Sequence, residues 1–457
     1  MFVSRRAFVV SLPLVAGFTP KLRALSPHIF GAAGDGSTDD APALQRAIDA
    51  LAKSGGGVLT LDDDRTYVCG TIILKTGVTL HLGRRTVLRA IADRSKFVST
   101  GALLFAEGAD SISITGSGRI DGNEDAFLKK DANGEWIAGP TGMGPYDAEP
   151  HTDAPGVITG RPRVIFFVRC TNVHLESFTI ERSPTWTLHL LGCVGAVIKQ
   201  LKIANNTSIP NNDAIDIDHC RNVRVLDCDI VTGDDGVCIK TTAPFKGWGP
   251  CEDILVRGCR ITSSSTAIKL GSAGPEDIRN VVVEGCIIRD SNCGVGIQNR
   301  DGAVFEDVIF SDLVIDTHYF EYSRWGAAEP IVITHLPRHK DQSSLGITRD
   351  IKFRGIICNG ESGVYFYADR RAPLQGISLE DVVIKIRKTS EWAGGYYDRR
   401  PADDFPKPIP SVISGIHAEN VIDYQESDCR IDMREARGRN YGPERTMINV
   451  KFTGGPK

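Results

Sequence analysis

The sequence lacks the features by which several classes of protein are recognised. It has no cluster of basic residues and a net charge of −4, so it offers no surface for nucleic acid. Its 12 cysteines include no Cys-x-x-Cys pair and no Cys/His cluster with zinc spacing. No apolar run is long enough to cross a bilayer. We therefore expect a monomer without a nucleic-acid partner, membrane insertion, metal or cofactor.

The N-terminus carries a different signal. The opening stretch MFVSRRAFVVSLPLVAGF places a twin arginine, Arg5-Arg6, before a short apolar run. This pattern resembles a twin-arginine export signal and predicts a signal peptide over residues 1–25. We therefore expect an exported protein, either periplasmic or extracellular. The alternative is an ordinary cytosolic N-terminus, and the sequence does not fix a cleavage site.

A repeated nine-residue phrase dominates the rest of the chain. It begins at residues 172, 195, 222, 253, 280, 307, 350 and 376. Its second, fourth and seventh residues are apolar, which predicts two short strands joined by a bend. Repeats of about 25 residues without intervening helices are typical of a stacked solenoid. We predict an all-β, single-stranded, right-handed parallel β-helix that forms one catalytic domain over residues 26–457.

Two positions within the phrase have structural interpretations. The Asn or Asp that opens most phrases suits a tight turn and predicts a polar ladder along the stack. Cys228, Cys259 and Cys286 fall in the inward position that Phe178 and Leu201 occupy in earlier phrases. We therefore predict that these cysteines form a packed core column.

The ends and interruptions of the solenoid also have sequence signals. Ser37 and Asp40 fit a capping box before an amphipathic helix that Gly55–Gly57 would end. This helix predicts an N-terminal cap over about residues 28–70, which covers the open end of the β-helix. Two interruptions, at about residues 123–163 and 316–347, predict loops that form the walls of a cleft.

The stretch IPNNDAIDIDHC, residues 209–220, contains three closely spaced aspartates. Ile215 and Ile217 alternate with acids, so the isoleucines are predicted to point inward and the acids outward. Aligning this strand with those around it yields three outward-facing columns of residues. The first column is Trp186, Asp213, Asp235, Thr266 and Cys293. The second is His189, Asp216, Cys238, Lys269 and Gly296. The third is Leu191, Asp218, Lys240, Gly271 and Gln298.

This alignment brings acids from two turns together. Neighbouring strands lie about 4.8 Å apart, so we expect Asp213 to lie beside Asp235 and Asp234. We also expect Asp218 to pair with Lys240. Carboxyl groups this close do not all ionise freely, so one is expected to keep a proton. One protonated acid and one ionised base are what glycoside hydrolysis requires. The alternative is that these aspartates only form turns.

Several of these motifs resemble those of a known family. NND at 211–213, TGDDGVCIK at 232–240 and the coil repeat are similar to the polygalacturonases, glycoside hydrolase family 28. The resemblance covers about residues 28–430. It implies a β-helix that acts on pectin-like polysaccharides or oligosaccharides, needs no metal and inverts the anomeric centre. It further implies that Asp234 is the general acid, while Asp213 and Asp235 position and deprotonate water.

Two family motifs are altered in this chain. Thr266 replaces the histidine of Gly-His-Gly, and Gly296-Ile297-Gln298 replaces Arg-Ile-Lys. The cations that hold a galacturonate carboxylate are thus missing. Lys269 or Arg300 is a candidate replacement, unless the bound sugar is neutral, a deoxysugar or another uronic acid. The residues expected to bind substrate are Trp186, His189, Asp216, Lys240, Lys269, Arg300, Trp325 and Glu329.

Two other functions are compatible with a β-helix. A lyase or C5-epimerase would use Lys240, Lys269 or Arg300 as its base, with the acids holding calcium. The predicted pairing of Lys240 argues against that role, because an ion pair keeps a lysine charged. A carbohydrate-binding protein without catalytic activity is the second alternative. The convergence of three acids favours the hydrolase over both.

Overall fold

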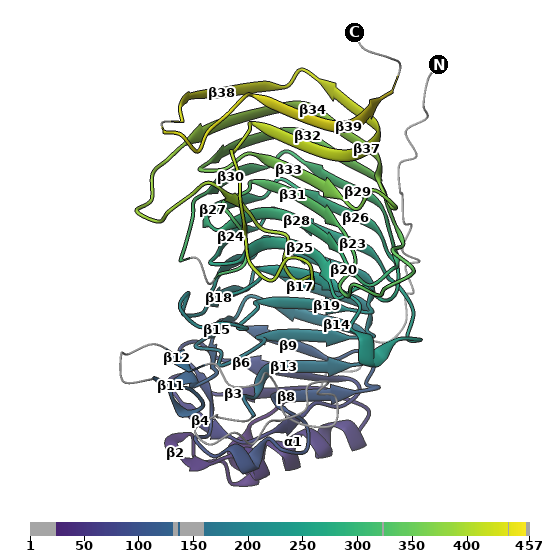
Figure 1. Cartoon of the computed structure of the whole chain (residues 1–457). Coiled ribbons are helices and arrows are strands. Elements are labelled where there is room, and N and C mark those ends of the chain that lie inside the picture. Colours follow the sequence, from purple (N-terminus) through teal and green to yellow (C-terminus); the bar gives the residue numbers. More distant parts are fainter. Residues whose placement is uncertain (1–23, 131–135, 138–159, 322–323, 437, 454–457) are drawn as a thin grey trace.

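The protein is seen in a computed structural model that describes residues 24–130, 136–137, 160–321, 324–436 and 438–453. The chain winds into a right-handed parallel β-helix, which confirms the predicted fold (Figure 1). Residues 1–23 of the predicted signal peptide and most of the predicted loop 123–163 lie outside the described residues. Within the described ranges, no helix has the length and apolar character needed to span a membrane.

Each coil contributes a strand to each of three parallel faces. Face 1 consists of β5 (Ile72–Ile73), β8 (Ala102–Glu107), β13 (Arg163–Val168), β16 (Leu188–Leu191), β19 (Ile215–Asp218), β22 (Val237–Lys240), β25 (Thr266–Ser272), β28 (Cys293–Asn299), β31 (Ile331–His335), β33 (Val364–Ala368) and the start of β37 (Ile416–Ser427). Face 2 consists of β1 (Ala24–Leu25), β3 (Gly57–Leu61), β6 (Val78–Leu82), β9 (Ser113–Gly116), β14 (Thr171–Glu176), β17 (Val194–Lys199), β20 (Arg221–Leu226), β23 (Cys251–Arg257), β26 (Ile278–Glu284), β29 (Val304–Ser311) and the first halves of β32 (Ile347–Gly360) and β34 (Leu374–Arg387). Face 3 consists of β2 (Asp35–Asp39), β4 (Thr66–Cys69), β7 (Val87–Ala90), β10 (Arg119–Asp121), β15 (Thr179–Glu181), β18 (Lys202–Ala204), β21 (Asp229–Thr232), β24 (Arg260–Ser263), β27 (Ile287–Ser291), β30 (Val314–Thr317), the second halves of β32 and β34, and β38 (Arg430–Glu435).

The remaining elements are short or terminal. They are β39 (Arg445–Phe452) on β37, the antiparallel pairs β11 (Lys129–Lys130) with β12 (Trp136–Ile137) and β35 (Tyr396–Tyr397) with β36 (Ile409–Pro410), and the 3₁₀ helices η1 (Pro27–Phe30), η2 (Arg94–Lys96), η3 (Glu124–Ala126) and η4 (Ala243–Phe245).

The residue that opens most phrases sets a sharp bend. Asn222, Asp253 and Asn280 lie in the left-handed region, with φ of 56°, 59° and 55°. Asn and Asp tolerate this conformation better than other residues with a Cβ. The side-chain Nδ2 of Asn280 donates to Asp253 Oδ1 of the preceding coil at 3.2 Å. The predicted polar ladder therefore forms at this pair.

The core confirms the predicted cysteine column. Cys228, Cys259 and Cys286 are buried and precede residues that pair in register from β21 to β24 to β27. All 12 cysteines are free thiols. A second buried column, which the sequence analysis did not identify, consists of Cys170, Cys193, Cys220 and Cys251.

The N-terminal cap is a helix, α1, over Ala41–Lys53, and its apolar face is buried as expected. The predicted capping box is wrong. Ser37 belongs to β2, and the Asp40 carboxylate accepts hydrogen bonds from the backbone N–H groups of Ala33 and Gly34 at 2.7 and 3.1 Å. The carboxylate of Asp40 therefore holds the chain that precedes the cap and does not bond to the first turn of α1.

The second predicted loop is divided by a strand. β31 (Ile331–His335) lies within residues 316–347 and continues face 1, so that interval is not one uninterrupted loop. A further long connection, residues 388–415, joins β34 to β37. Figure 1 shows it as a yellow-green trace that passes in front of the face 1 strands.

Candidate active site

Face 1 places the aspartates as the sequence alignment predicts. Ile215 of β19 pairs with Val237 of β22, which puts Asp213 in register with Asp235. A carboxylate oxygen from each of Asp213, Asp234 and Asp235 lies within 4.8 Å of the other two. All three residues are more than nine-tenths buried. Two successive turns therefore form one carboxylate cluster on the outer side of face 1.

Short polar residues join these two turns. The side chain of Asn212 donates from Nδ2 to the carbonyl of Asn206 at 2.9 Å and accepts from the Gly233 N–H at 2.8 Å. A Cβ at Gly233 would lie 2.2 Å from the Ile209 carbonyl oxygen, so only glycine fits this close approach. The motifs NND and TGDD therefore also specify how the turns pack.

Each carboxylate of the Asp234–Asp235 pair has defined donors. Asp234 Oδ2 accepts from the Asn211 N–H at 2.8 Å. Asp235 Oδ1 accepts from the Ser265 hydroxyl at 3.0 Å, and its Oδ2 lies 2.8 Å from Lys269 Nζ. Asp213 differs, because its buried Oδ1 has no hydrogen-bond partner among the described residues.

The predicted pair between Asp218 and Lys240 is wrong. Lys240 Nζ lies 2.5 Å from Asp216 and 3.7 Å from Asp213, above the ring of Trp186. Asp218 instead accepts from the backbone N–H and the hydroxyl of Thr242 at 2.9 and 2.7 Å. The flexible lysine stem allows Nζ to reach acids in the two neighbouring columns, which the column alignment alone does not predict.

The environment shifts the pKa values of the cluster. Burial and the charges of Asp216 and Asp234 raise the pKa of Asp213, while burial and the charge of Asp235 raise that of Asp234. Burial also raises the pKa of Asp216, to about 6, against the opposing effect of Lys240. Burial disfavours the charged form of Lys240, but the carboxylates of Asp216 and Asp213 prevail and raise its pKa.

Arg161 lies close to the cluster and was not predicted as a site residue. It is fully buried and donates to the Pro184 carbonyl at 2.8 Å, and its positive charge acts on Asp213 and Asp234. Its pKa is lowered by burial to about 10, so it stays charged near neutral pH. Its only sequence signal was its place in GRPRV, a stretch outside the repeat.

These groups do not balance in charge. Four carboxylates, those of Asp213, Asp216, Asp234 and Asp235, meet three cations, those of Arg161, Lys240 and Lys269. One negative charge is therefore left over. One proton shared among the buried acids removes that imbalance. The cluster then holds one protonated acid beside ionised carboxylates, which is the state that acid–base catalysis requires.

His189 and Trp186 form the aromatic side of the site. The His189 ring stacks on Phe166 with centroids 4.8 Å apart, and its Nε2 lies 3.3 Å from Asp218. Burial lowers the pKa of His189 to about 4, so the ring is neutral near pH 7. It is buried and contacts Asp218 where Asp216 was expected. The Trp186 ring lies 3.7 Å from Lys240 Nζ and helps to hold that cation.

Two residues expected to bind substrate do not reach the surface. Arg300 is fully buried and donates to the carbonyls of Pro401 and Thr334 at 2.9 and 2.8 Å. Glu329 is buried beneath the same region, where it accepts the N–H of Ala327 at 2.6 Å. Neither Arg300 nor Glu329 is exposed in this structure, and their contact with substrate stays a prediction.

Arg324, in the loop after β30, contacts the two loops that carry the acids, and the sequence analysis did not identify it. Arg324 donates to the carbonyl of Ser208 at 2.8 Å and to that of Gly233 at 3.5 Å. It thus contacts both loops that carry the aspartates. Its neighbour Trp325, one of the predicted substrate-binding residues, is 37% exposed. No repeat position marks Arg324, because it lies in the interruption between β30 and β31.

Comparisons with known proteins identify the family of the chain. A probable polygalacturonase of Vitis vinifera is 24% identical over 449 residues, which cover 90% of this chain and 85% of that protein. The crystal structure of a hyperthermoactive exopolygalacturonase from Thermotoga maritima matches with a TM-score of 0.71 at 22% identity, covering 90% of this chain and 92% of that one. A family 28 exopolygalacturonase of Yersinia enterocolitica has the same TM-score at 17% identity, covering 96% and 80%. The profile of glycosyl hydrolases family 28 matches residues 73–394, which is well over half of the chain. The chain therefore belongs to glycosyl hydrolases family 28 and is a glycosidase.

Proposed function

We propose that this protein is exported and hydrolyses glycosidic bonds in a pectin-like or related acidic polysaccharide or oligosaccharide, with inversion. One observation carries the proposal: three buried aspartates from successive turns present carboxylate oxygens within 4.8 Å of one another. The relatives named as polygalacturonases support a pectic substrate. The Arg5-Arg6 signal supports export.

The roles follow from the family resemblance and the contacts. Asp234 is the general acid by the family resemblance, because burial raises the pKa of Asp213 as well as that of Asp234 and does not by itself distinguish the two. Asp213 and Asp235 hold the attacking water. Lys269 balances the charge of Asp235.

The spacing of the carboxyl groups bears on the stereochemistry of the reaction. Carboxyl groups of inverting enzymes are typically about 6.5–9.5 Å apart, and those of retaining enzymes about 5 Å. Here one oxygen from each acid lies within 4.8 Å of the other two, a limit that fits either arrangement, so the proposed inversion rests on the family resemblance. Proton NMR of the first-formed product decides the question. A retained anomer would make Asp213 or Asp235 a nucleophile and would contradict the water-holding role.

The three candidate bases of a lyase mechanism, Lys240, Lys269 and Arg300, are not free to accept a proton. Lys240 and Lys269 are paired with carboxylates, and despite burial those carboxylates raise the pKa of both lysines. Arg300 is fully buried. None of the three is placed to abstract a proton from a sugar ring near neutral pH.

The substrate is identified by release of reducing ends from homogalacturonan, rhamnogalacturonan and other uronate polysaccharides. We expect the wild type to act on a member of this set and Asp234→Asn to remain folded but lose activity. Asp229→Asn, at an exposed position of β21 on face 3, is the matched control and keeps activity. Release by the wild type from neutral glycans alone would contradict the acidic-substrate proposal.

A further inference from the structure

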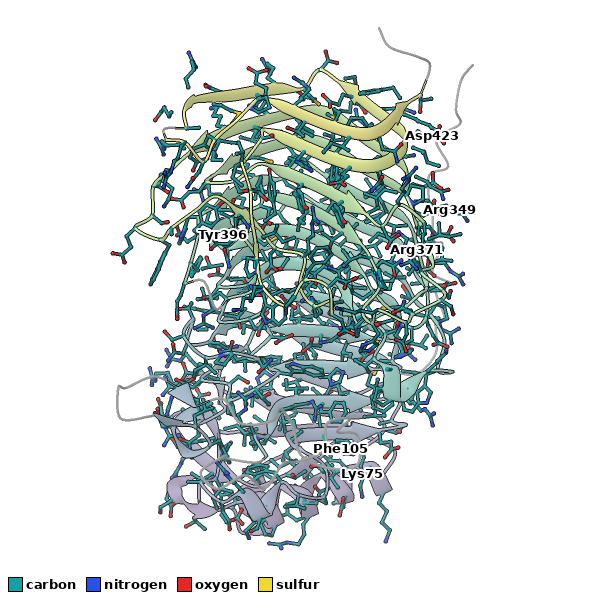
Figure 2. The ribbon with its side chains drawn as sticks, in the orientation of Figure 1. Lys75, Phe105, Arg349, Arg371, Tyr396 and Asp423 are labelled. Atoms are coloured by element: carbon teal, nitrogen blue, oxygen red, sulfur yellow. The ribbon has the colours of Figure 1, made fainter. Side chains whose placement is uncertain are left out.

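Three successive serines, Ser263–Ser265, lead from β24 into β25, in the coil after the one that carries Asp235. All three are at most 2% exposed. A buried hydroxyl group costs free energy unless it is hydrogen-bonded, so each of these serines needs a partner. Figure 1 labels β24 and β25 in the middle of the solenoid, and Figure 2 shows side chains packed densely along those coils, above Phe105 of β8. The partners of all three lie in the two loops that carry the aspartates.

The three hydroxyls have different kinds of partner. Two of them donate to backbone carbonyl oxygens of the acid-bearing loops, Ser263 to that of Asp234 at 2.6 Å and Ser264 to that of Thr207 at 2.8 Å. The hydroxyl of Ser265 donates instead to Oδ1 of Asp235, at 3.0 Å. Ser265 therefore contacts a carboxylate of the cluster, while the other two serines hold the loops around it.

The Asp235 carboxylate is held at both of its oxygens. Oδ1 also accepts from the Thr266 N–H at 3.4 Å, and Oδ2 lies 2.8 Å from Lys269 Nζ. These donors all belong to residues 265–269, so β25 and the turn before it set the direction of the carboxylate. The terminal torsion of an aspartate otherwise has only a broad preference. Ser265 and Lys269 therefore restrict a carboxylate that would rotate more freely without them.

The Ser265 hydroxyl also acts on the neighbouring acid. Burial and the charge of Asp235 raise the pKa of Asp234, and the charge of Lys269 and hydrogen bonds from Asn211 and Ser265 oppose that rise. Ser265 thus lies between the proposed general acid and a residue that holds the water.

The resemblance in sequence does not imply these contacts. Thr266 replaces the histidine of Gly-His-Gly, so Ser265 stands at the first glycine of that motif. A glycine at this position has no hydroxyl to donate. The bond from Ser265 to Asp235 therefore comes from the residues of this chain and not from the family motif.

We propose that Ser265 is a positioning residue that fixes the direction of the Asp235 carboxylate toward the attacking water. It acts through Asp235 and does not touch the substrate. This inference rests on the proposed hydrolysis, in which Asp213 and Asp235 hold that water. A displacement of about 1 Å between reacting groups can cost a factor of about 10² in rate, so the direction of one carboxylate matters for catalysis.

Ser265→Ala removes the hydroxyl and tests this role through kcat and KM. The loss of one hydrogen bond to a charged group should lower kcat by a factor of roughly 10 to 100 and leave KM unchanged. Ser265→Thr keeps a hydroxyl and should recover most of the lost rate. Ser291→Ala is the matched control and should keep the wild-type kcat. Ser291 is as buried as Ser265, but its hydroxyl donates to the carbonyl of Arg289, at 3.0 Å, and not to a carboxylate.

Urea unfolding shows that each variant is folded under the assay conditions, and Ser265→Gly makes the same test if the alanine variant does not fold. Equal kcat values for Ser265→Ala and Ser291→Ala would overturn the inference. A raised KM with an unchanged kcat would do the same, because it would place Ser265 against the substrate. Hydrolysis by the wild type leaves the proposed function intact in both cases. Absence of hydrolysis of every uronate polysaccharide would overturn the proposed function, and with it this inference.

The pH profile of kcat/KM separates positioning from a loss of folded enzyme. The titratable groups that face Asp235 all stay in the variant, and they are Asp213, Asp216, Asp234, Lys269 and the thiols of Cys238 and Cys293. Without the hydroxyl of Ser265 the carboxylates are neutralised more easily, so both limbs of the profile should move to higher pH, by up to about one pH unit. Partial unfolding would lower the rate and leave the limbs in place. Limbs that do not move in Ser265→Ala would contradict the positioning role.

Discussion

The pair between Lys269 and Asp235 allows a sharp test of the electrostatics of the cluster. Lys269 Nζ lies 2.8 Å from Asp235 Oδ2, and the two side chains are only 12% and 4% exposed. Lys269→Met keeps much of the side-chain volume but removes the cation. Removing one partner of a buried pair typically costs about 3–5 kcal/mol, because it leaves an uncompensated charge.

The carboxylate left without its partner can take up a proton, which limits this cost in stability and makes it depend on pH. An ordinary Asp titrates near 3.9, so neutralising one at about pH 7 costs roughly 4 kcal/mol, and at about pH 5 only roughly 1.5 kcal/mol. We therefore expect Lys269→Met to lose about 3–4 kcal/mol at about pH 7 and less than half of that at about pH 5. The sign follows from linkage: the unpaired carboxylate is neutralised more easily at low pH, so the variant loses stability as pH rises.

Urea unfolding followed by circular dichroism at both pH values measures the effect. The double variant Lys269→Met/Asp235→Asn carries no charge at either position and is expected to recover most of the loss. A Lys269→Met protein as stable as the wild type at about pH 7 would refute the reasoning. So would a loss of the same size at both pH values that Asp235→Asn does not relieve.

Three further predictions concern the site and the core. Burial and Asp235 raise the pKa of Asp234, so kcat/KM should fall with rising pH only above the pH range in which ordinary carboxyl groups titrate. A pH profile of kcat/KM that does not fall at alkaline pH would contradict the role of Asp234 as an acid. Chelators should leave activity unchanged, whereas a calcium requirement would show that the acid cluster holds a cation. Ile217→Ala removes a fully buried side chain of β19 and should lower the free energy of unfolding by about 2–5 kcal/mol, as measured in urea. Ile309→Ala, at a side chain that is 39% exposed, should change it far less, and equal effects would contradict the assigned core.

The repeat predicted both the fold and the placement of the acids, because the alternation of inward and outward residues along each strand determines both. Each phrase alternates inward and outward residues, and a left-handed Asn or Asp fixes the bend, as at Asn222 and Asp253. Strand alternation leaves little freedom of register once one face is buried. Aligning the inward residues of β19 and β22 was therefore enough to bring Asp213 beside Asp235.

The sequence could not predict contacts that depend on side-chain direction or on distant segments. A column alignment places Lys240 beside Asp218, but the lysine stem turns to Asp216. Arg300 is predicted to be an outward cation next to the site, but it is buried and donates to the carbonyls of Arg399 and Pro401, about a hundred residues further along the chain. Ser37 fits a capping pattern, but strand pairing of β2 holds it away from α1.

The central claim is that the aspartates of two adjacent turns hydrolyse a glycosidic bond. The most direct test of this claim is hydrolysis in ¹⁸O-labelled water. Wild type and Asp234→Asn are incubated with the preferred uronate polysaccharide, and the first products are analysed by mass spectrometry and ultraviolet absorption. The account predicts that the wild type makes new reducing ends that carry ¹⁸O and new non-reducing ends that are saturated, and that the rate of Asp234→Asn is lower by a factor of about 10²–10⁴. An unlabelled product with an absorbing double bond, or an undiminished rate in the variant, would contradict it.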